Sequence, residues 1–320
     1  MTMAPIETAV LEPAVRNADE PAPNHIIPRP DCHSGHLPGW VRSRLWTAAS
    51  GKTTQSLRLA LPVSFGVATQ TAAYKLENDD ATVLERLAEG TLVAGIFDGV
   101  TIPRRNHRAG HAVAAFVRER LRANLVEADG RRPIIENVLA SAIEESVGVL
   151  ERLGGGAATT ATVLVAVPMR TRDWRLYLIN AGNSRATAFH ADGTVEPLTL
   201  IKPAGTSFAA VNTLTAGYRY RREASKVTKP PGTLVLLTSD GVHDHVPDRA
   251  IWADLGRAVE SVLRAPHSDS DLERLVRAFV ENAVARAVAA QQRIARPDDT
   301  TAMAVLLGDP STELAQKRVG

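Results

Sequence analysis

The sequence has few of the features that mark secreted or membrane-bound proteins. It contains one cysteine, Cys32, which cannot form an internal disulfide and is typical of a reducing compartment. No uninterrupted apolar run approaches the roughly 18 residues that suggest a membrane span. The N-terminus also lacks the basic start and apolar run of a signal peptide. We therefore expect a cytoplasmic protein.

The sequence also lacks an excess of charge of one sign. Its 37 basic residues nearly balance its 35 acidic residues, which leaves a formal net charge of +2. A protein that binds nucleic acid or an anionic membrane as its main partner usually carries a clear positive excess. The balance therefore argues against both of these partners.

Composition divides the 320 residues into three regions. Residues 1–60 are rich in proline and keep no helical or strand period, so we expect a disordered arm. The arm holds Cys32, His33 and His36 close together, but zinc sites usually add a second ligand pair at a distance, so a polar tail is the favoured interpretation. Residues 61–310 carry the regular apolar patterns of a folded domain, and residues 311–320 form a C-terminal tail.

The apolar patterns predict strands and helices in separate blocks. Strands are expected over residues 63–71, 91–99, 159–168, 174–182, 184–190, 233–241 and 300–307. Helices are expected over about 107–127, after Pro133, and twice before the last strand, the later one opening at residue 270 with a capping-box pattern. Because strands and helices do not alternate regularly, a doubly wound parallel sheet is disfavoured and a layered α+β sandwich is favoured.

Acidic residues recur where the predicted strands begin or end. They are Asp79, Asp80, Asp98, Asp240, Asp298 and Asp299. A lone Asp-Gly pair is usually a turn, and each aspartate could be a turn or cap residue. Several ionised carboxylates beside very apolar strands are costly unless they are paired or bind a cation. Oxygen ligands select hard ions, so the pattern favours Mg²⁺ or Mn²⁺.

Six motifs over roughly residues 62–308 resemble the PP2C-type (PPM) metal-dependent serine/threonine protein phosphatases. In order they are KLENDDA, VAGIFDG, GGGAATTATVLVA, LYLINAGNSRA, LVLLTSDGVHD and PDDTTAMAV. The resemblance implies a four-layer α/β/β/α sandwich in which helix pairs flank two antiparallel sheets. It also implies two Mg²⁺ or Mn²⁺ ions bridged by a water that attacks the phosphate directly.

The resemblance assigns roles to individual residues. The metal ligands would be Asp79, Asp98, Asp240 and Asp298, together with the carbonyl of Gly99. Asp79 stands where the family commonly has glutamate. Asp80 would hold a metal-bound water. Lys75 stands where the family usually has a phosphate-binding arginine, and a lysine keeps the charge without the bidentate fork.

Two positions depart from the family pattern. Val100 replaces the histidine that is assigned as general acid in eukaryotic members. Metal-bound water, His107, His111 or His243 are the alternative proton donors. Asn183 replaces the aspartate of a third metal site, so we expect a third metal there to be weak or absent.

The leading hypothesis is a phosphoserine/phosphothreonine protein phosphatase, with a phosphorylated protein as substrate and a cognate kinase whose action it reverses. We expect a monomer. One alternative is a pseudophosphatase that acts as a regulatory binding module, which Val100, Lys75 and Asn183 favour. The other is a phosphatase of a small phosphorylated metabolite. The basic residues between 198 and 229 argue mildly against a metabolite, because they could contact a protein, although a solvated loop would look the same.

Overall fold

The computed structural model describes residues 63–100, 108–125, 134–154, 156–190, 194–200, 213–217, 220–247, 250–251, 271–292, 294 and 297–308. All of these belong to one unit, Ser34–Gly320. The arm expected over residues 1–60, with Cys32, His33 and His36, lies outside the described residues, as does the tail over 311–320. No helix of the described residues is long and apolar enough to cross a membrane.

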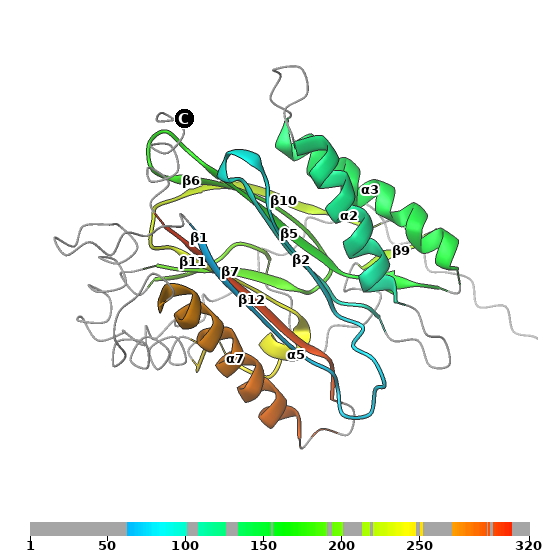
Figure 1. Ribbon diagram of the computed structural model, residues 1–320. Helices are drawn as coiled ribbons and strands as arrows, with labels where there is room; N and C mark the ends of the chain where they lie inside the picture. The colour runs from blue at the N-terminus through cyan, green and yellow to red at the C-terminus, as the bar shows by residue number, and fades with distance from the viewer. Residues whose placement is uncertain are drawn as a thin grey trace, which may run out of the picture. The chain divides into compact units, whose positions relative to one another are not determined.

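The described residues form two antiparallel five-stranded sheets (Figure 1). The first has the order β1-β12-β11-β7-β8, with bounds Val63–Gln70, Thr300–Leu307, Leu234–Thr238, Arg185–Phe189 and Val195–Pro197. The second has the order β10-β6-β5-β3-β2, with bounds Glu223–Lys229, Trp174–Ala181, Ala161–Pro168, Leu92–Phe97 and Ala81–Arg86. A small third sheet pairs β4 (Ala158–Thr159) with β9 (Leu214–Thr215), and a 3₁₀ turn, η1, covers Ala88–Gly90.

The strands with the most apolar sequences lie inside the sheets and face apolar layers on both sides. Every residue of β3, β11 and β12 is buried. An apolar cluster between the sheets contains Ile96, Leu164 and Val305. Strands that are buried on both faces read as continuous apolar runs, which is why these three are clear in the sequence.

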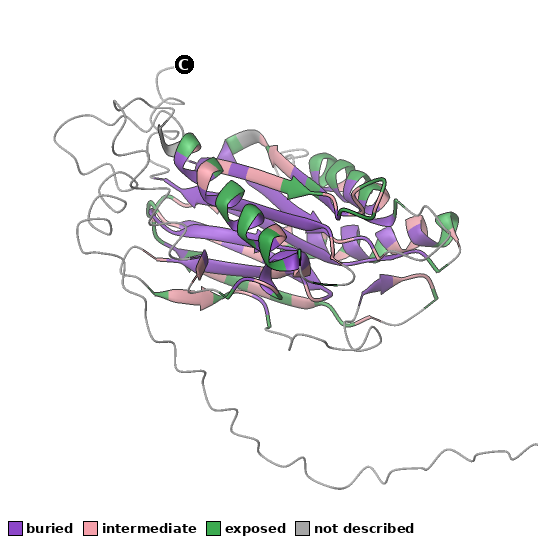
Figure 2. Cartoon of the chain, turned by 90° about the horizontal axis from the view of Figure 1, so that it is seen from below, coloured by how far each residue is buried: buried purple, intermediate pink, exposed green. Residues whose placement is uncertain are grey.

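Helices cover the outer faces of the sheets. Helices α2 (Ala109–Leu125) and α3 (Ile135–Leu153) pack on the second sheet, where Val113, Val117 and Ile143 join its apolar cluster. Helix α7 (Asp271–Gln291) packs on the first sheet with Phe279, and the short helix α5 (Asp240–His243) lies beside it. Figure 2 shows the buried strands between helices whose outward faces are exposed.

The layered α+β sandwich expected from the sequence is confirmed. Two boundaries differ from the expectation: Asp240 opens helix α5 instead of ending strand β11, and the segment before β6 is divided into β4 and β5. Three edge strands, β2, β8 and β10, and the two-residue strand β9 have no counterpart in the expected elements. Strands β8 and β9 are very short, and β2 and β10 carry charged residues, so none of the four gives a long apolar run.

Candidate active site

The candidate site lies where strand ends from both sheets meet. In the first sheet, Gln70 at the end of β1 is opposite Thr300 at the start of β12, and Thr238 at the end of β11 is opposite Ala302. These registers place the loop after β1, the start of α5 and residues 298–299 at the same edge. The edge therefore receives Asp79, Asp240 and Asp298 from three distant parts of the chain.

The second sheet delivers its carboxylates in the same way. Ala81 at the start of β2 is opposite Phe97 at the end of β3, so Asp80 and Asp98 occupy neighbouring strand ends. Thr160 holds the backbone of Asp98 from both sides. Its N–H donates to the Asp98 carbonyl at 2.8 Å, and its Oγ1 accepts from the Asp98 N–H at 3.0 Å. Oγ1 of Thr159 also donates to that carbonyl at 2.9 Å. The ATTA segment thus fixes the position of Asp98.

Two glycines let the site's backbone segments approach closely. A Cβ on Gly99 would lie 2.6 Å from the carbonyl oxygen of Asp79, and a Cβ on Gly241 would lie 1.9 Å from that of Asp299. Any larger residue would push these segments apart, because a real Cβ does not approach that closely. The glycine after Asp98 and the glycine after Asp240 therefore have a steric role in the site.

Asp98, Asp240 and Asp80 form a group of neighbouring carboxylates with raised pKa values. Burial raises the pKa of Asp98 well above its usual value, and the charges of Asp240, Asp80 and Asp298 raise it further. Burial also raises the pKa of Asp240, with a further contribution from the charge of Asp298. Burial raises the pKa of Asp80 to about 7, against the hydrogen bonds from Thr301 and Ser239. Each of these groups would be stabilised in its ionised form by a nearby cation.

This donor set fits a hard divalent cation. The ligating atoms are carboxylate oxygens, and Oδ2 of Asp80 is buried with no hydrogen-bond partner. Among the described residues, however, no three acidic, histidine or cysteine side chains converge closely enough to hold an ion as they stand. Side-chain rotations of the carboxylates would be needed to bring their oxygens within ligand distance.

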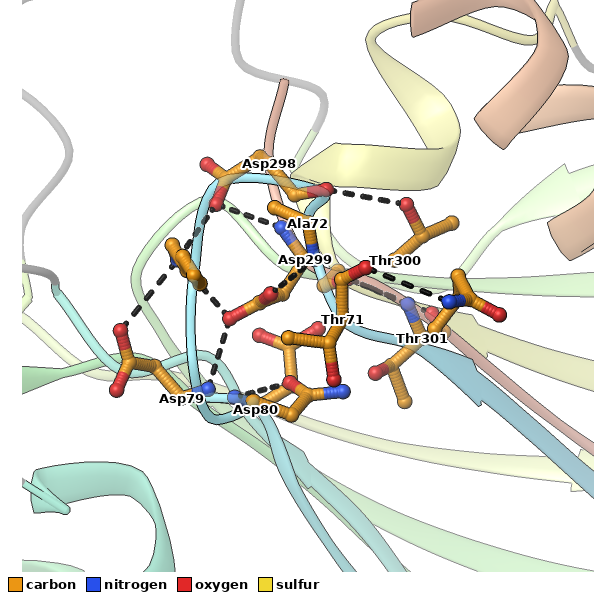
Figure 3. Close-up of polar contacts among 12 residues, drawn as sticks. Thr71, Ala72, Asp79, Asp80, Asp298, Asp299, Thr300 and Thr301 are labelled. Carbon is orange, nitrogen blue, oxygen red and sulfur yellow. Dashed lines mark hydrogen bonds and ion pairs between the residues drawn. The ribbon is translucent and has the colours of Figure 1, made fainter. Parts of the chain in front are cut away.

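Lys75 occupies the other part of this edge. Its Nζ lies 2.9 Å from Oδ2 of Asp299, 3.2 Å from Oδ1 of Asp298 and 3.4 Å from Oδ2 of Asp79, and its side chain is only 6% exposed. Figure 3 shows the three carboxylates turned toward a common point. Burial alone would lower the pKa of Lys75, but the hydrogen bond to Asp299 and the charges of Asp298 and Asp299 outweigh burial and raise it. Lys75 is therefore a stably charged cation.

Asp299 holds the loop that carries Lys75. Its Oδ1 accepts from the N–H of Ala72 at 2.8 Å, and its Oδ2 accepts from the N–H of Asp79 at 2.7 Å (Figure 3). The side chain is 1% exposed. Backbone donors and a lysine together satisfy this buried carboxylate, which is the condition for burying a charge.

Asn183 turns its amide nitrogen toward the carboxylates. Its Nδ2 donates to Oδ2 of Asp240 at 2.8 Å. In this orientation the amide supports the ionised form of Asp240, and hydrogen bonding to Asn183 opposes the rise in the pKa of Asp240. The amide oxygen, which is the side-chain atom of Asn183 that could ligate a metal, is not the atom that faces Asp240.

Comparison with family models gives a match to protein phosphatase 2C over residues 69–277. The matched segment spans more than half of the chain and contains Asp79, Asp98 and Asp240. The chain belongs to the protein phosphatase 2C family. The resemblance found in the sequence motifs is thereby confirmed. A search of curated proteins finds no significant match.

Solved structures confirm that the fold is that of protein phosphatase 2C. The Mycobacterium tuberculosis serine/threonine phosphatase PstP/Ppp is 18% identical, with a TM-score of 0.55, and the match covers 77% of this chain and 99% of that one. A PstP catalytic domain in complex with two manganese ions has 18% identity, a TM-score of 0.53 and the same coverage. The S. agalactiae serine/threonine phosphatase has 14% identity, a TM-score of 0.55, and coverage of 77% and 99%.

The histidines named as alternative proton donors lie in different settings in this protein phosphatase 2C chain. His243 is buried, and its Nδ1 lies 3.0 Å from Oγ1 of Thr238. Burial and the charge of Arg185 hold the pKa of His243 well below its usual value. His111 lies on α2 with its Nε2 2.9 Å from the carbonyl oxygen of Asn78, beside the loop of the site. His107 lies outside the described residues.

Gln291 is a site residue that sequence reasoning missed. It ends helix α7, is 2% exposed, and donates from Nε2 to the carbonyl of Gly241 at 2.7 Å and to Oγ1 of Thr300 at 3.0 Å. Its Oε1 accepts from the N–H of Asp298. Gln291 thus connects the start of α5 with the start of β12. Its position just before the PDD motif was the only sequence signal, and that signal does not distinguish it from an exposed glutamine.

Proposed function

We propose that this protein phosphatase 2C chain hydrolyses phosphoserine and phosphothreonine in proteins by direct attack of water, with two Mg²⁺ or Mn²⁺ ions as cofactors. The observation that carries the proposal is the group formed by Asp98, Asp240 and Asp80, in which burial raises the pKa of all three carboxyl groups and the charges of Asp240 and Asp80 raise that of Asp98 further. When bound, the two ions would neutralise the phosphate dianion and lower the pKa of the attacking water.

The residues that would hold these ions are Asp79, Asp98, Asp240 and Asp298, together with the carbonyl of Gly99. Asp298 has a side chain that is 47% exposed, so this end of the site is open to a bulky phosphoester. The unpartnered Oδ2 of Asp80 would accept a hydrogen bond from the attacking water and orient it. Val100 cannot donate a proton to the leaving oxygen, so that proton would come from solvent or from a residue such as His111.

The comparisons support the phosphatase class and the fold. A phosphorylated protein is the proposed substrate, and a kinase that phosphorylates the same protein is the proposed partner. We also propose that the chain acts as a monomer in the cytoplasm. A third metal at Asn183 remains predicted to be weak or absent, and the donor orientation of its amide toward Asp240 supports that prediction.

A pseudophosphatase is the second candidate function. The contact of Lys75 with three carboxylates favours it, because a lysine ammonium group occupies space beside the proposed ligands Asp79 and Asp298. A binding module of this kind would recognise the phosphorylated partner without turning it over.

Hydrolysis of p-nitrophenyl phosphate separates these candidates. We expect turnover with Mn²⁺, loss of turnover with EDTA, and loss of turnover in Asp240→Asn. The matched control is Asp173→Asn, because Asp173 lies in the turn between β5 and β6, which is at the opposite end of the second sheet. Absence of turnover with Mn²⁺, or an active Asp240→Asn, would contradict the enzyme. A phosphothreonine peptide hydrolysed no faster than small phosphate esters would favour a metabolite substrate.

A further inference from the structure

Some carboxylates of the site form ion pairs with a lysine side chain, and others do not. Nζ of Lys75 lies within 3.4 Å of Asp79, Asp298 and Asp299. No ion pair between a lysine or arginine side chain and Asp98 or Asp80 is found within the described residues. Asp298 interacts with both sets of carboxylates. Its Oδ1 contacts Lys75, as Asp79 and Asp299 do, and its charge raises the pKa of Asp98 and Asp240.

The contacts of Lys75 are fixed by the backbone. Two backbone N–H groups from its own loop, those of Ala72 and Asp79, bind the carboxylate of Asp299, and Lys75 lies between them in the chain. The N–H of Lys75 in turn donates to the carbonyl of Ala72 at 2.9 Å. Because both ends of the loop are hydrogen-bonded to Asp299, the ammonium group of Lys75 is held beside the carboxylates. Only 6% of the Lys75 side chain is exposed.

A divalent cation and the Lys75 ammonium group compete for the same oxygens. A cation bound by Asp79 would need an oxygen at about 2.1 Å, whereas Lys75 forms an ion pair with Oδ2 of Asp79 and donates a hydrogen bond to Oδ1 of Asp298. Two positive groups at adjacent positions also repel each other strongly in a partly buried site. A cation that takes these two oxygens therefore requires that Lys75 move away.

We propose that Lys75 is an internal counter-ion that occupies the Asp79 side of the site, so that divalent cations bind in two unequal steps. The first ion binds tightly at Asp98 and Asp240. The second ion binds weakly at Asp79, because it must displace the lysine ammonium group. This positioning role differs from the phosphate-contacting role that the sequence resemblance gave to Lys75, and it rests on the proposed metal-dependent function.

Mn²⁺ titration of the metal-free full chain by isothermal calorimetry tests the proposal. We expect two binding steps in the wild type. In Lys75→Met, which keeps the length of the side chain but removes its charge, the weaker step should tighten by about tenfold or more, and the tighter step should change little. The control is Lys226→Met, which removes another lysine that is hydrogen-bonded to a carboxylate, at 2.6 Å from Glu136, far from the site.

A second pair of variants keeps the test decisive if Lys75→Met does not fold. Asp299→Asn alone and Asp299→Asn with Lys75→Met differ only in the lysine charge, and the double variant leaves neither partner buried without its counter-charge. The double variant should bind the second ion about tenfold more tightly than Asp299→Asn alone. Thermal unfolding of each variant without metal confirms that it is folded before the titration.

The outcomes separate this proposal from the proposed function. Unchanged Mn²⁺ affinities in Lys75→Met overturn the counter-ion role, and weaker competitive inhibition by inorganic phosphate in that variant would then place Lys75 on the phosphate. A second step that weakens in Lys75→Met also overturns it. If the wild type binds no Mn²⁺ at all, the metal-dependent function itself is contradicted.

Discussion

Both sides of the site bring carboxylates close together, but only one side places a lysine side chain among them. On one side, Asp98, Asp240 and Asp80 are gathered with no lysine or arginine ion pair to Asp98 or Asp80 among the described residues, and burial raises the pKa of each carboxylate. On the other side, Asp299 is more deeply buried than Asp98 or Asp240, but Lys75 and two backbone N–H groups satisfy it. The first side could therefore bind a cation from solution, whereas the second already contains the ammonium group of Lys75.

The comparison implies that the loss of a carboxylate affects activity far more on the first side. Asp98→Asn should reduce kcat by a factor of about 10³ or more, because it removes a charge that the proposed ions need at the reacting phosphate. The matched variant, Asp173→Asn, removes an aspartate at the far end of the second sheet. Steady-state kinetics with p-nitrophenyl phosphate and Mn²⁺ would measure both. Similar rates for the two variants would show that Asp98 contributes no more to catalysis than an aspartate in the remote turn.

The two sides are joined at Gly241, and a larger residue there should destabilise the fold. Gly241→Ala would place a Cβ 1.9 Å from the carbonyl oxygen of Asp299, so the start of α5 and the residues before β12 would have to separate. We expect a loss of about 3 kcal/mol in the free energy of unfolding, as for other overpacked sites. Denaturant unfolding measures it.

Gly148→Ala is the control for that substitution. Gly148 lies in α3, and a Cβ there would meet only Nη1 of Arg152 at 3.7 Å. Alanine is a better helix former than glycine, so this change should be neutral or stabilising. Equal effects of the two substitutions would show that the two sides are not held together at Gly241.

The fold could be predicted in outline because its central strands carry long apolar runs. Strand β12 has the bounds expected from TTAMAVLL, and β3 and β11 lie within their expected ranges. Strands β2 and β10 were missed because edge strands have an exposed face and need no apolar run. The sequence ATVLER of β2 alternates weakly, and EASKVTK of β10 carries three charged residues.

The site could be predicted only where chemistry and strand ends coincide. Asp98 and Asp240 follow apolar strands, so their position was visible in the sequence. The contact between Lys75 and Asp299 joins residues 224 positions apart and depends on the antiparallel pairing of β1 with β12. No local pattern encodes that distance. For the same reason, the family resemblance implied a phosphate-binding role for Lys75 and no contact with Asp299.

The stability of the metal-free protein should depend on pH through the first side. The folded pKa of Asp80, about 7, lies above the value of about 3.9 for an unfolded aspartate. The folded state therefore binds the proton more tightly, and this contribution to stability is full below pH 4 and is lost as the pH rises through 7. Thermal unfolding in EDTA should show a lower Tm at pH 8 than at pH 5.5.

Asp80→Asn sharpens that pH prediction. The amide has no charge to bury, so the fall in Tm between pH 5.5 and pH 8 should be smaller in this variant than in the wild type. Asp299→Asn should leave most of the fall in place, because burial is a larger cause of the raised pKa of Asp80 than the charge of Asp299. An equal reduction in both variants would contradict the assignment of the pH dependence to the first side.

Asn183→Asp should produce the smallest change. The carboxylate would replace an amide that donates to Asp240, and it would add a negative charge to the side that already lacks positive charge. We expect an additional Mn²⁺ to bind up to about tenfold more tightly. Asn124→Asp, an exposed position on α2, is the control. Calorimetric titration with Mn²⁺ compares the affinities of the two variants. Equal affinities would show that position 183 takes no part in a metal site.

The position of bound Mn²⁺ is the most direct test of the difference between the two sides of the site. Crystals of the full chain soaked in Mn²⁺ would show the ion by its anomalous scattering. We expect the strongest anomalous peak between the carboxylates of Asp98 and Asp240, with a weaker peak at Asp79 where Lys75 has moved away. A strongest peak at Asp79 with Lys75 unmoved, or no peak at Asp98 and Asp240, would contradict the unequal binding of the two ions.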